Sequence, residues 1–261
     1  GSEGGTLRFI TPAPSLSGFS GYAHAEGAMT ENGDPSAELG VALGGPLVEG
    51  TVGFRASAWH RRDGGYIDRL SPQTGAVLDR RANSGTTDVA RLAVRFQLND
   101  RFSVTPAVFY QKSTRHDQDL SWEDAGPRQA LYALPSPITD RFVLPSLDVE
   151  WNLDRVTVRS ITSYFDRSAE RFADATAFDL SGLLPDGAIA IPGNPDYVAN
   201  SFYRNSQRNW TEEVRFTSNE SPADRWSWVA GLYYQKNEQG LFDWYAEPLG
   251  PVTTYLATLT T

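Results

Sequence analysis

The sequence predicts an all-β fold in which about nine long antiparallel strands follow one another up and down, as in a transmembrane β-barrel. Three observations support this fold class. Apolar and polar residues alternate over stretches of about ten residues, the length that a tilted strand needs to cross a bilayer. The connections between these stretches alternate between short and long. Most charged side chains in them fall opposite the apolar face, where a wide and wet interior tolerates charge.

The clearest example is residues 87–112, which read as two strands joined by a turn at Asn99-Asp100. Every second residue from Ala90 to Leu98 is apolar, and so is every second residue from Phe102 to Tyr110. Alternation with a period of two indicates a strand with one apolar face, and Asn and Asp suit a tight turn. A long hairpin of a soluble β-protein would look the same, so the fold class depends on how often the pattern recurs.

The pattern recurs along the rest of the chain. A short strand is expected at residues 4–11, ended by Pro12 and Pro14. Further long strands are expected at residues 18–29, 36–43, 51–60, 142–151, 156–167, 207–218 and 225–236. The connections are short at 44–50, 98–101, 152–155 and 219–224, intermediate at 30–35, and long at 61–86, 113–139 and 168–205. Tight turns on one side and long loops on the other are the layout of an outer-membrane barrel, whereas a sandwich has no reason to segregate them.

Two strands fit the pattern less well. In the strand expected at 156–167, Ile161 and Phe165 share a face with two arginines, Arg159 and Arg167. In the strand expected at 207–218, Glu212 falls on the apolar side, which predicts either a β-bulge or a position at the membrane–water interface.

The composition excludes several classes of protein. The chain has 261 residues, a formal net charge of −9 and no cysteine. Because no basic run is present to neutralise phosphates, a nucleic-acid partner is not expected. The absence of cysteine excludes a disulfide scaffold and cysteine-ligated metal sites. No stretch approaches the roughly 18 apolar residues of a membrane helix, which leaves strands as the elements that would cross a membrane.

Several segments resemble TonB-dependent outer-membrane receptors. Residues 3–16 (EGGTLRFITPAPSL) resemble the junction at which the plug domain of such a receptor ends and its barrel begins. Residues 44–68 (GGPLVEGTVGFRASAWHRRDGGYID) resemble the early barrel strands. Residues 211–218 (TEEVRFTS) and 226–239 (WSWVAGLYYQKNEQ) resemble a strand–turn–strand later in the same barrels. The resemblance covers nearly the whole chain, and the order and spacing of the segments make it specific.

The resemblance implies a barrel of about 22 strands with a plugged lumen. Residues 1–16 would be the end of the plug domain, and residues 17–261 the N-terminal part of the barrel. The chain is then expected to be a fragment of a receptor of the Gram-negative outer membrane, for energy-coupled uptake of a scarce nutrient such as a ferric siderophore, cobalamin or an oligosaccharide. The expected partners are outer-membrane lipid, the TonB complex through a missing N-terminal part, and a small-molecule substrate such as a metal chelate or a glycan. No cofactor is expected.

Two other function classes stay open on the sequence. A passive outer-membrane porin would have similar strands, although it has no plug strand to end near residue 14. A soluble all-β enzyme or carbohydrate-binding module is disfavoured by the loop asymmetry and the charged strand faces. No catalytic constellation is expected, since neighbouring carboxylates such as Glu212 and Glu213 point to opposite faces of a strand.

The candidate ligand contacts are aromatic side chains and an arginine of the long loops. Aromatic platforms with an arginine suit a catecholate, a sugar or an acidic chelate. These candidates are Trp122, Tyr132, Tyr197, Phe202, Tyr203 and Arg204. Packing of the loop side chains against one another is the alternative interpretation.

No metal site is expected. The three histidines, His24, His60 and His116, are dispersed along the chain. An acidic stretch offers candidate calcium ligands, namely Asp117, Asp119, Glu123 and Asp124. Because the spacing and the glycine of an EF-hand are missing, a solvated acidic loop is the favoured interpretation.

Overall fold

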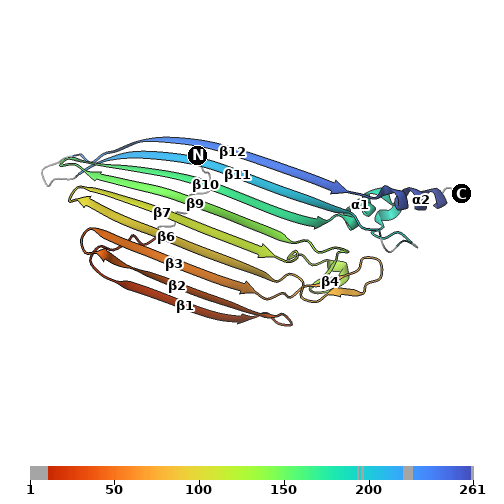
Figure 1. Ribbon diagram of the computed structural model, residues 1–261. Helices are drawn as coiled ribbons and strands as arrows, with labels where there is room; N and C mark the ends of the chain where they lie inside the picture. Colours follow the sequence, from red (N-terminus) through yellow and green to blue (C-terminus); the bar gives the residue numbers. More distant parts are fainter. Residues whose placement is uncertain (1–10, 193, 195–196, 220–225, 260–261) are drawn as a thin grey trace.

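The computed structural model describes residues 11–192, 194, 197–219 and 226–259. Its main feature is one curved antiparallel sheet of nine strands, in which spatial order follows chain order throughout (Figure 1). The strands are β1 (Ser20–Met29), β2 (Pro35–Val48), β3 (Val52–Asp63), β6 (Gly85–Asn99), β7 (Phe102–Arg115), β9 (Ile138–Asn152), β10 (Val156–Asp174), β11 (Asn200–Ser218) and β12 (Val229–Ala246). The predicted up-and-down arrangement of about nine long strands is therefore confirmed.

The remaining elements all lie at the long-loop end of this sheet (Figure 1). A small second sheet has the order β5-β4-β8. Its strands are β5 (Val77–Asp79), β4 (Asp68–Leu70) and β8 (Gln129–Leu131), and the helical elements are η1 (Glu123–Ala125), α1 (Thr176–Leu183), η2 (Pro185–Gly187) and α2 (Leu249–Leu259). In the described part of the chain, no helix is both long enough and apolar enough to cross a membrane.

The connections segregate by length, as predicted, but the long loops are shorter than expected. They span residues 64–84, 116–137 and 175–199, instead of 61–86, 113–139 and 168–205. The strand ladders continue into these polar segments. Glu170 pairs in register with Arg204, for example, and Thr87 with Ser113. Backbone hydrogen bonds and cross-strand polar pairs extend the strands beyond the apolar alternation on which the prediction rested.

The two faces of the main sheet differ in exposure, and the difference is opposite to that in a soluble protein. On β6 the apolar side chains of Ala90, Leu92, Phe96 and Leu98 are exposed, whereas Arg91, Arg95 and Gln97 on the other face are partly covered. The same holds for β7 and β9, where Val108, Tyr110, Val143 and Leu147 are all more than a third exposed. We call these two surfaces the apolar face and the polar face. A soluble sheet buries its apolar face, whereas this sheet leaves its apolar face exposed.

The strand register shows on which face the unusual residues of β10 and β11 lie. Arg159, Ile161, Phe165 and Arg167 of β10 all belong to the polar face, since Arg159 pairs with Glu150 and Ile161 with Asp148. Glu212 lies on the apolar face, where it pairs with Thr162 in an uninterrupted ladder between β10 and β11. No bulge displaces it, so the bulge interpretation of Glu212 is wrong.

Compact packing is concentrated in the loops and not on the main sheet. A cluster of buried side chains joins the loop after β10 to α2, and it consists of Ala175, Leu180, Leu184, Ile191, Tyr197, Ala199 and Val252. The two helices of this cluster were not anticipated from the sequence. The strand expected at residues 4–11 lies almost entirely outside the described residues.

Candidate functional site

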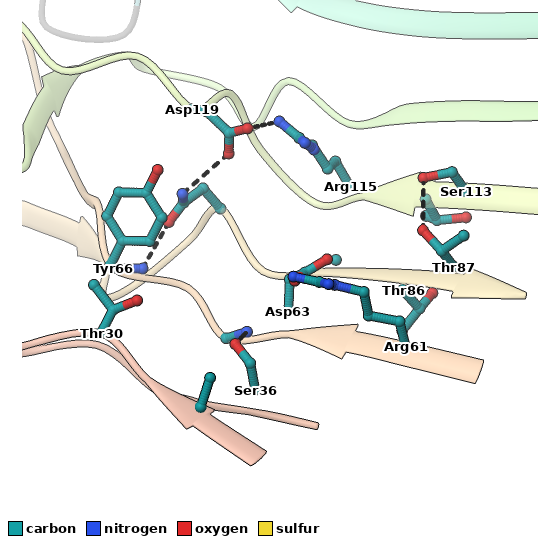
Figure 2. Close-up of a pocket in the computed structure, with 15 residues that line it drawn as sticks. Thr30, Ser36, Arg61, Asp63, Tyr66, Thr86, Thr87, Ser113, Arg115 and Asp119 are labelled. Carbon is teal, nitrogen blue, oxygen red and sulfur yellow. Dashed lines mark hydrogen bonds and ion pairs between the residues drawn. The ribbon is translucent and has the colours of Figure 1, made fainter. Parts of the chain in front are cut away.

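The long-loop end of the polar face encloses a cavity of about 500 Å³ (Figure 2). It lies among the ends of β1, β2, β3, β6 and β7, and the loop between β3 and β6 forms one of its walls. Its volume falls within the range of ligand sites, roughly 300–1,000 Å³. The lining side chains are mostly hydroxyl-bearing or charged, and they include Thr30, Ser36, Arg61, Asp63, Tyr66, Asn83, Thr86, Thr87, Ser113, Thr114, Arg115 and Asp119.

The charged groups of this cavity are paired. On β3, Arg61 Nε lies 2.8 Å from Asp63 Oδ1, and Arg61 Nη1 lies 3.1 Å from Glu38 Oε2 of β2. Arg115, the last residue of β7, pairs with Asp119 in the following loop. The cavity therefore presents donors and acceptors without a strong excess of either charge.

Asn83 holds the loop wall of the cavity in place. Its Oδ1 accepts the backbone N–H groups of Tyr66 at 2.7 Å and Ile67 at 2.9 Å, and its Nδ2 donates to Asp119 Oδ1 at 3.1 Å. The Asn83 side chain is buried. Through these three hydrogen bonds it joins the loop after β3 to the loop after β7. A short amide can hold a loop in this way because it pairs with backbone groups that would otherwise lack partners.

Hydroxyl groups provide most of the remaining polar surface. Thr87 Oγ1 and Ser113 Oγ lie 3.1 Å apart across β6 and β7, and Ser36 Oγ accepts the Gly64 N–H at 2.9 Å. Such a lining suits a polar ligand that is held by several hydrogen bonds.

An aromatic group lies on the polar face next to the cavity. The rings of Tyr22 and His24 on β1 stack with Trp59 of β3, with centroids 6.0 and 5.9 Å from the indole. Gly40 of β2 lies between them, and a Cβ there would come within 2.4 Å of the indole ring. Trp59 Nε1 donates to Glu38 Oε1 at 2.6 Å. Since Glu38 also contacts Arg61, the aromatic group and the cavity share one hydrogen-bonded network.

The comparisons with known proteins bear on this arrangement. No family model and no curated protein matches the sequence. The crystal structure of the ferric yersiniabactin uptake receptor FyuA from Yersinia pestis is similar to the chain, with a TM-score of 0.70 and 17% sequence identity. The likeness covers 91% of this chain and 33% of the FyuA chain, so the chain spans about a third of that receptor's length.

The chain has the fold of a TonB-dependent receptor. The resemblance noted in the sequence is therefore confirmed at the level of the fold, and so is the barrel class of the sheet. In a barrel of this fold the polar face is the inner surface, which lines the lumen. The cavity and the aromatic group then lie on the lumen wall, at the end of the strands that carries the long loops.

The six ligand candidates from the sequence do not form one group in this receptor fold. Trp122 and Tyr132 come together beside the small sheet, with ring centroids 5.8 Å apart in an edge-on arrangement. Phe202, Tyr203 and Arg204 belong to β11 instead of a loop. Phe202 and Arg204 lie on the apolar face, where Arg204 pairs with Glu170 at 2.9 Å.

Tyr203 and Tyr197 have different surroundings. Tyr203 lies on the polar face, and its hydroxyl bonds to that of Tyr245 on β12. Tyr197 is 2% exposed and packs inside the helical cluster. Burial raises the pKa of the Tyr197 hydroxyl, and the nearby Asp179 and Glu247 carboxylates raise it further. For Tyr197, these surroundings favour the alternative interpretation, in which loop side chains pack against one another.

The acidic loop separates into two networks. Asp117 is buried beside Arg69, with 3.1 Å between Oδ2 and Nε, and its Oδ1 accepts the N–H groups of Gln118 and Ser136. Burial raises the pKa of Asp117, although these N–H donors and Arg69 act in the opposite direction. Asp119 belongs to the cavity. Within the described residues, no group of three or more His, Cys, Asp or Glu side chains is placed to hold a metal ion.

His116 and Ser84 are within hydrogen-bonding distance of each other. His116 Nδ1 lies 3.1 Å from Ser84 Oγ and 3.0 Å from the Ser84 carbonyl oxygen. A carbonyl only accepts hydrogen bonds, so the contact favours a protonated Nδ1, which cannot take the serine proton. The pair links the starts of two loops and is not arranged as a nucleophile and its base.

Sequence reasoning missed the cavity because its residues come from five strands and three connections between them. The only available signal was the cluster of charged and hydroxyl residues at each strand end, such as Arg61 to Asp63 on β3 and Ser113 to Arg115 on β7. These residues were assigned to loops, so their convergence could not be seen before the register was known.

Proposed function

We propose that the chain is part of an outer-membrane receptor that takes up a scarce nutrient with energy supplied through the TonB complex. The observation that carries this proposal is the reversed exposure of the main sheet, with its apolar face outward, in a chain that shares the fold of FyuA. The apolar face offers lipid a surface, and the polar face offers a wide lumen. Binding and passage of the substrate require no bond chemistry.

The fold and the cavity support a proposal for the class of substrate. FyuA is described as a ferric yersiniabactin uptake receptor, so a ferric chelate is the first candidate, with cobalamin and an oligosaccharide as further ones. Hydroxyls and paired charges in the cavity suit the oxygen-rich surface of each. Trp122, Tyr132 and Tyr203 are the aromatic candidates that we retain for ligand contact. Tyr197, Phe202 and Arg204 are weaker candidates because of their burial or their position on the apolar face.

The domain division is also part of the proposal. We assign residues 1–16 to the end of a plug domain and residues 17–261 to the barrel. In support, the Leu16 carbonyl accepts the Gly50 N–H at 2.9 Å, and a Cβ on Gly53, on the polar face of β3, would come within 2.2 Å of the Ser15 carbonyl oxygen. The chain thus joins β1 from the lumen side, where a plug would lie. Residues 1–10 are outside the described part of the chain.

The test uses cells that depend on the gene. Deleting it should abolish accumulation of a radiolabelled ferric chelate, and inactivating TonB should have the same effect. The double variant Arg115→Ala/Asp119→Ala should weaken chelate binding without loss of the protein from the outer membrane. The matched control is Arg159→Ala/Asp148→Ala, which removes an ion pair of 2.5 Å on the polar face away from the cavity.

Two outcomes would contradict the proposal. Accumulation that continues without TonB would indicate a passive porin. Fractionation of the protein with the soluble proteins of the cell would remove the membrane assignment altogether and favour a soluble carbohydrate-binding module.

A further inference from the structure

Two unpaired cations face each other on the apolar face. Lys112 of β7 pairs in register with Arg141 of β9. Both side chains are exposed, and neither makes an ion pair or hydrogen bond with another residue in the part of the chain that the structure describes. Like charges directly opposite each other on a sheet are destabilising. An anion between them would remove that cost.

The nearby carboxylates already have partners. Asp88 of β6 is opposite Lys112, but its Oδ1 lies 2.7 Å from His60 Nδ1. Asp166 of β10 is diagonal to Arg141, and its Oδ2 lies 3.8 Å from Arg208 Nε. Neither carboxylate forms an ion pair with Lys112 or Arg141, so an anion from outside the described chain can contact both cations.

The two cations lie where the apolar band ends. From Phe102 to Lys112 the strand rises roughly 34 Å at about 3.4 Å per residue, which is roughly 26 Å along the membrane normal at a tilt of about 40°. Every apolar-face residue of β7 between these two positions is apolar or aromatic, and the same holds on β9 between Trp151 and Val143. The apolar band of a barrel is about 25 Å tall, so Lys112 and Arg141 lie at the level of lipid head groups.

Two grooves flank Tyr110 on the same face, just below the cations. One has a volume of about 410 Å³ and passes over the small side chains of Ala58 and Ala90. The other has a volume of about 250 Å³ and is lined by Arg141, Val143 and other residues of β9 and β10. The two grooves leave room for an acyl chain on either side of the Tyr110 ring.

We infer that this part of the apolar face, between β3 and β10, is a binding site for a phosphate-bearing lipid with several acyl chains. A phosphate group lies between Lys112 and Arg141, and acyl chains lie in the grooves on the two sides of Tyr110. The occupant is a lipid because the cations face the bilayer at the level where lipid phosphates are found. The inference rests on the proposed membrane location and adds a specific lipid partner to it.

The experiment reconstitutes the full-length protein into phosphatidylcholine vesicles and titrates it with lipid A or with dephosphorylated lipid A. The test variant is Lys112→Gln/Arg141→Gln. The control is Arg208→Gln/Lys236→Gln, which removes the same charge from the same face at cations that have ion-pair partners. Each unpaired cation should contribute about five-fold to affinity for the phosphorylated lipid, so the test variant should lose about twenty-five-fold. The control should stay within about two-fold of the wild type.

A second variant tests the grooves. Ala58→Leu/Ala90→Leu fills one groove and leaves the charges unchanged, so it should weaken binding of both forms of lipid A. The inference is overturned if the wild type binds the two forms equally, or if the test variant and the control have the same affinity. Insertion is measured separately by protection of the strands from protease. A wild type that fails to insert overturns the proposed membrane location and the lipid site together, whereas insertion without preference for phosphate overturns the lipid site alone.

Discussion

Strands β1–β9 and strands β10–β12 differ sharply on the apolar face. Below Lys112 and Arg141, the first group carries no charged residue on this face. The second group carries five at the corresponding levels, namely Asp166, Arg208, Glu212, Lys236 and Glu238. All five have partners. Asp166 faces Arg208, Lys236 Nζ lies 2.6 Å from Glu238 Oε1, and Glu212 accepts hydrogen bonds from Ser160 and Thr162.

The exposed apolar face of this sheet is therefore built in two ways. One omits charge, and the other keeps charge but satisfies each group within the sheet.

The largest expected effect comes from placing an unpaired charge among strands β1–β9. Leu147→Arg on β9 should lower the free energy of unfolding in lipid vesicles by about 2–4 kcal/mol, because the guanidinium would face hydrocarbon near the middle of the band. Urea titration followed by tryptophan fluorescence measures this loss. The control is Ser146→Arg, which lies on the polar face. Equal losses in the two variants would contradict the assignment of the faces.

The second-largest loss of unfolding free energy is expected when the partners of a charge in β10–β12 are removed. Ser160→Ala/Thr162→Ala leaves the Glu212 carboxylate without its two hydroxyl donors and should cost about 1.5–3 kcal/mol in the same titration. Adding Glu212→Leu to this variant should recover most of the loss, since no charge is then left unsatisfied. If the triple variant is as unstable as the double variant, the hydroxyls act through packing instead of through the carboxylate.

A smaller and local effect is expected at the cavity wall. Asn83→Ala removes the acceptor of two backbone N–H groups and should destabilise the loop at residues 64–84 by about 1 kcal/mol. Hydrogen exchange at Tyr66 and Ile67 should become faster, while exchange in β6 stays unchanged. Faster exchange throughout the sheet would show that the loop and the strands unfold as one unit.

The smallest effect concerns Asp179 of α1. Burial raises the pKa of Asp179 above its ordinary value of 3.8, with further contributions from Glu247 and Asp174. The folded state then binds the proton more tightly than the unfolded state, so ionisation opposes folding as pH rises through the folded pKa. Protease resistance of the helical cluster should fall as the pH rises above the ordinary Asp pKa of about 4 in the wild type. Asp179→Asn should be more resistant at neutral pH and lose the dependence, and an unchanged pH profile would contradict the assignment.

Much of the sheet could be predicted from the sequence because alternation has a direct physical cause. Lipid on one face and a wet lumen on the other impose a period of two, as in residues 87–112. Strand ends were less predictable, since pairs such as Glu170 and Arg204 extend the ladder with polar residues on both faces. Glu212 was recognised as unusual, but its partners Ser160 and Thr162 belong to another strand and required the register.

The loops and the cavity were beyond sequence reasoning for a different reason. The strands of the small sheet have three residues each, too short for any period to be visible, and β4 pairs in parallel with β8 from a distant loop. The α1 helix has eight residues, and its position is fixed by contacts with α2 far along the chain. Among the candidate ligand residues, composition alone could not distinguish the buried Tyr197 from the lumen-facing Tyr203.

The unequal lengths of the strands give the rim of this part of the barrel two heights. β10 and β11 have 19 residues each, against 10 in β1 and 14 in β2. At about 3.3 Å per residue and a tilt of about 40°, the longer strands rise roughly 48 Å, about twice the thickness of the apolar band. The helical cluster then stands at the high part of the rim, while a small solute has its shortest path to the cavity over the low turn between β1 and β2.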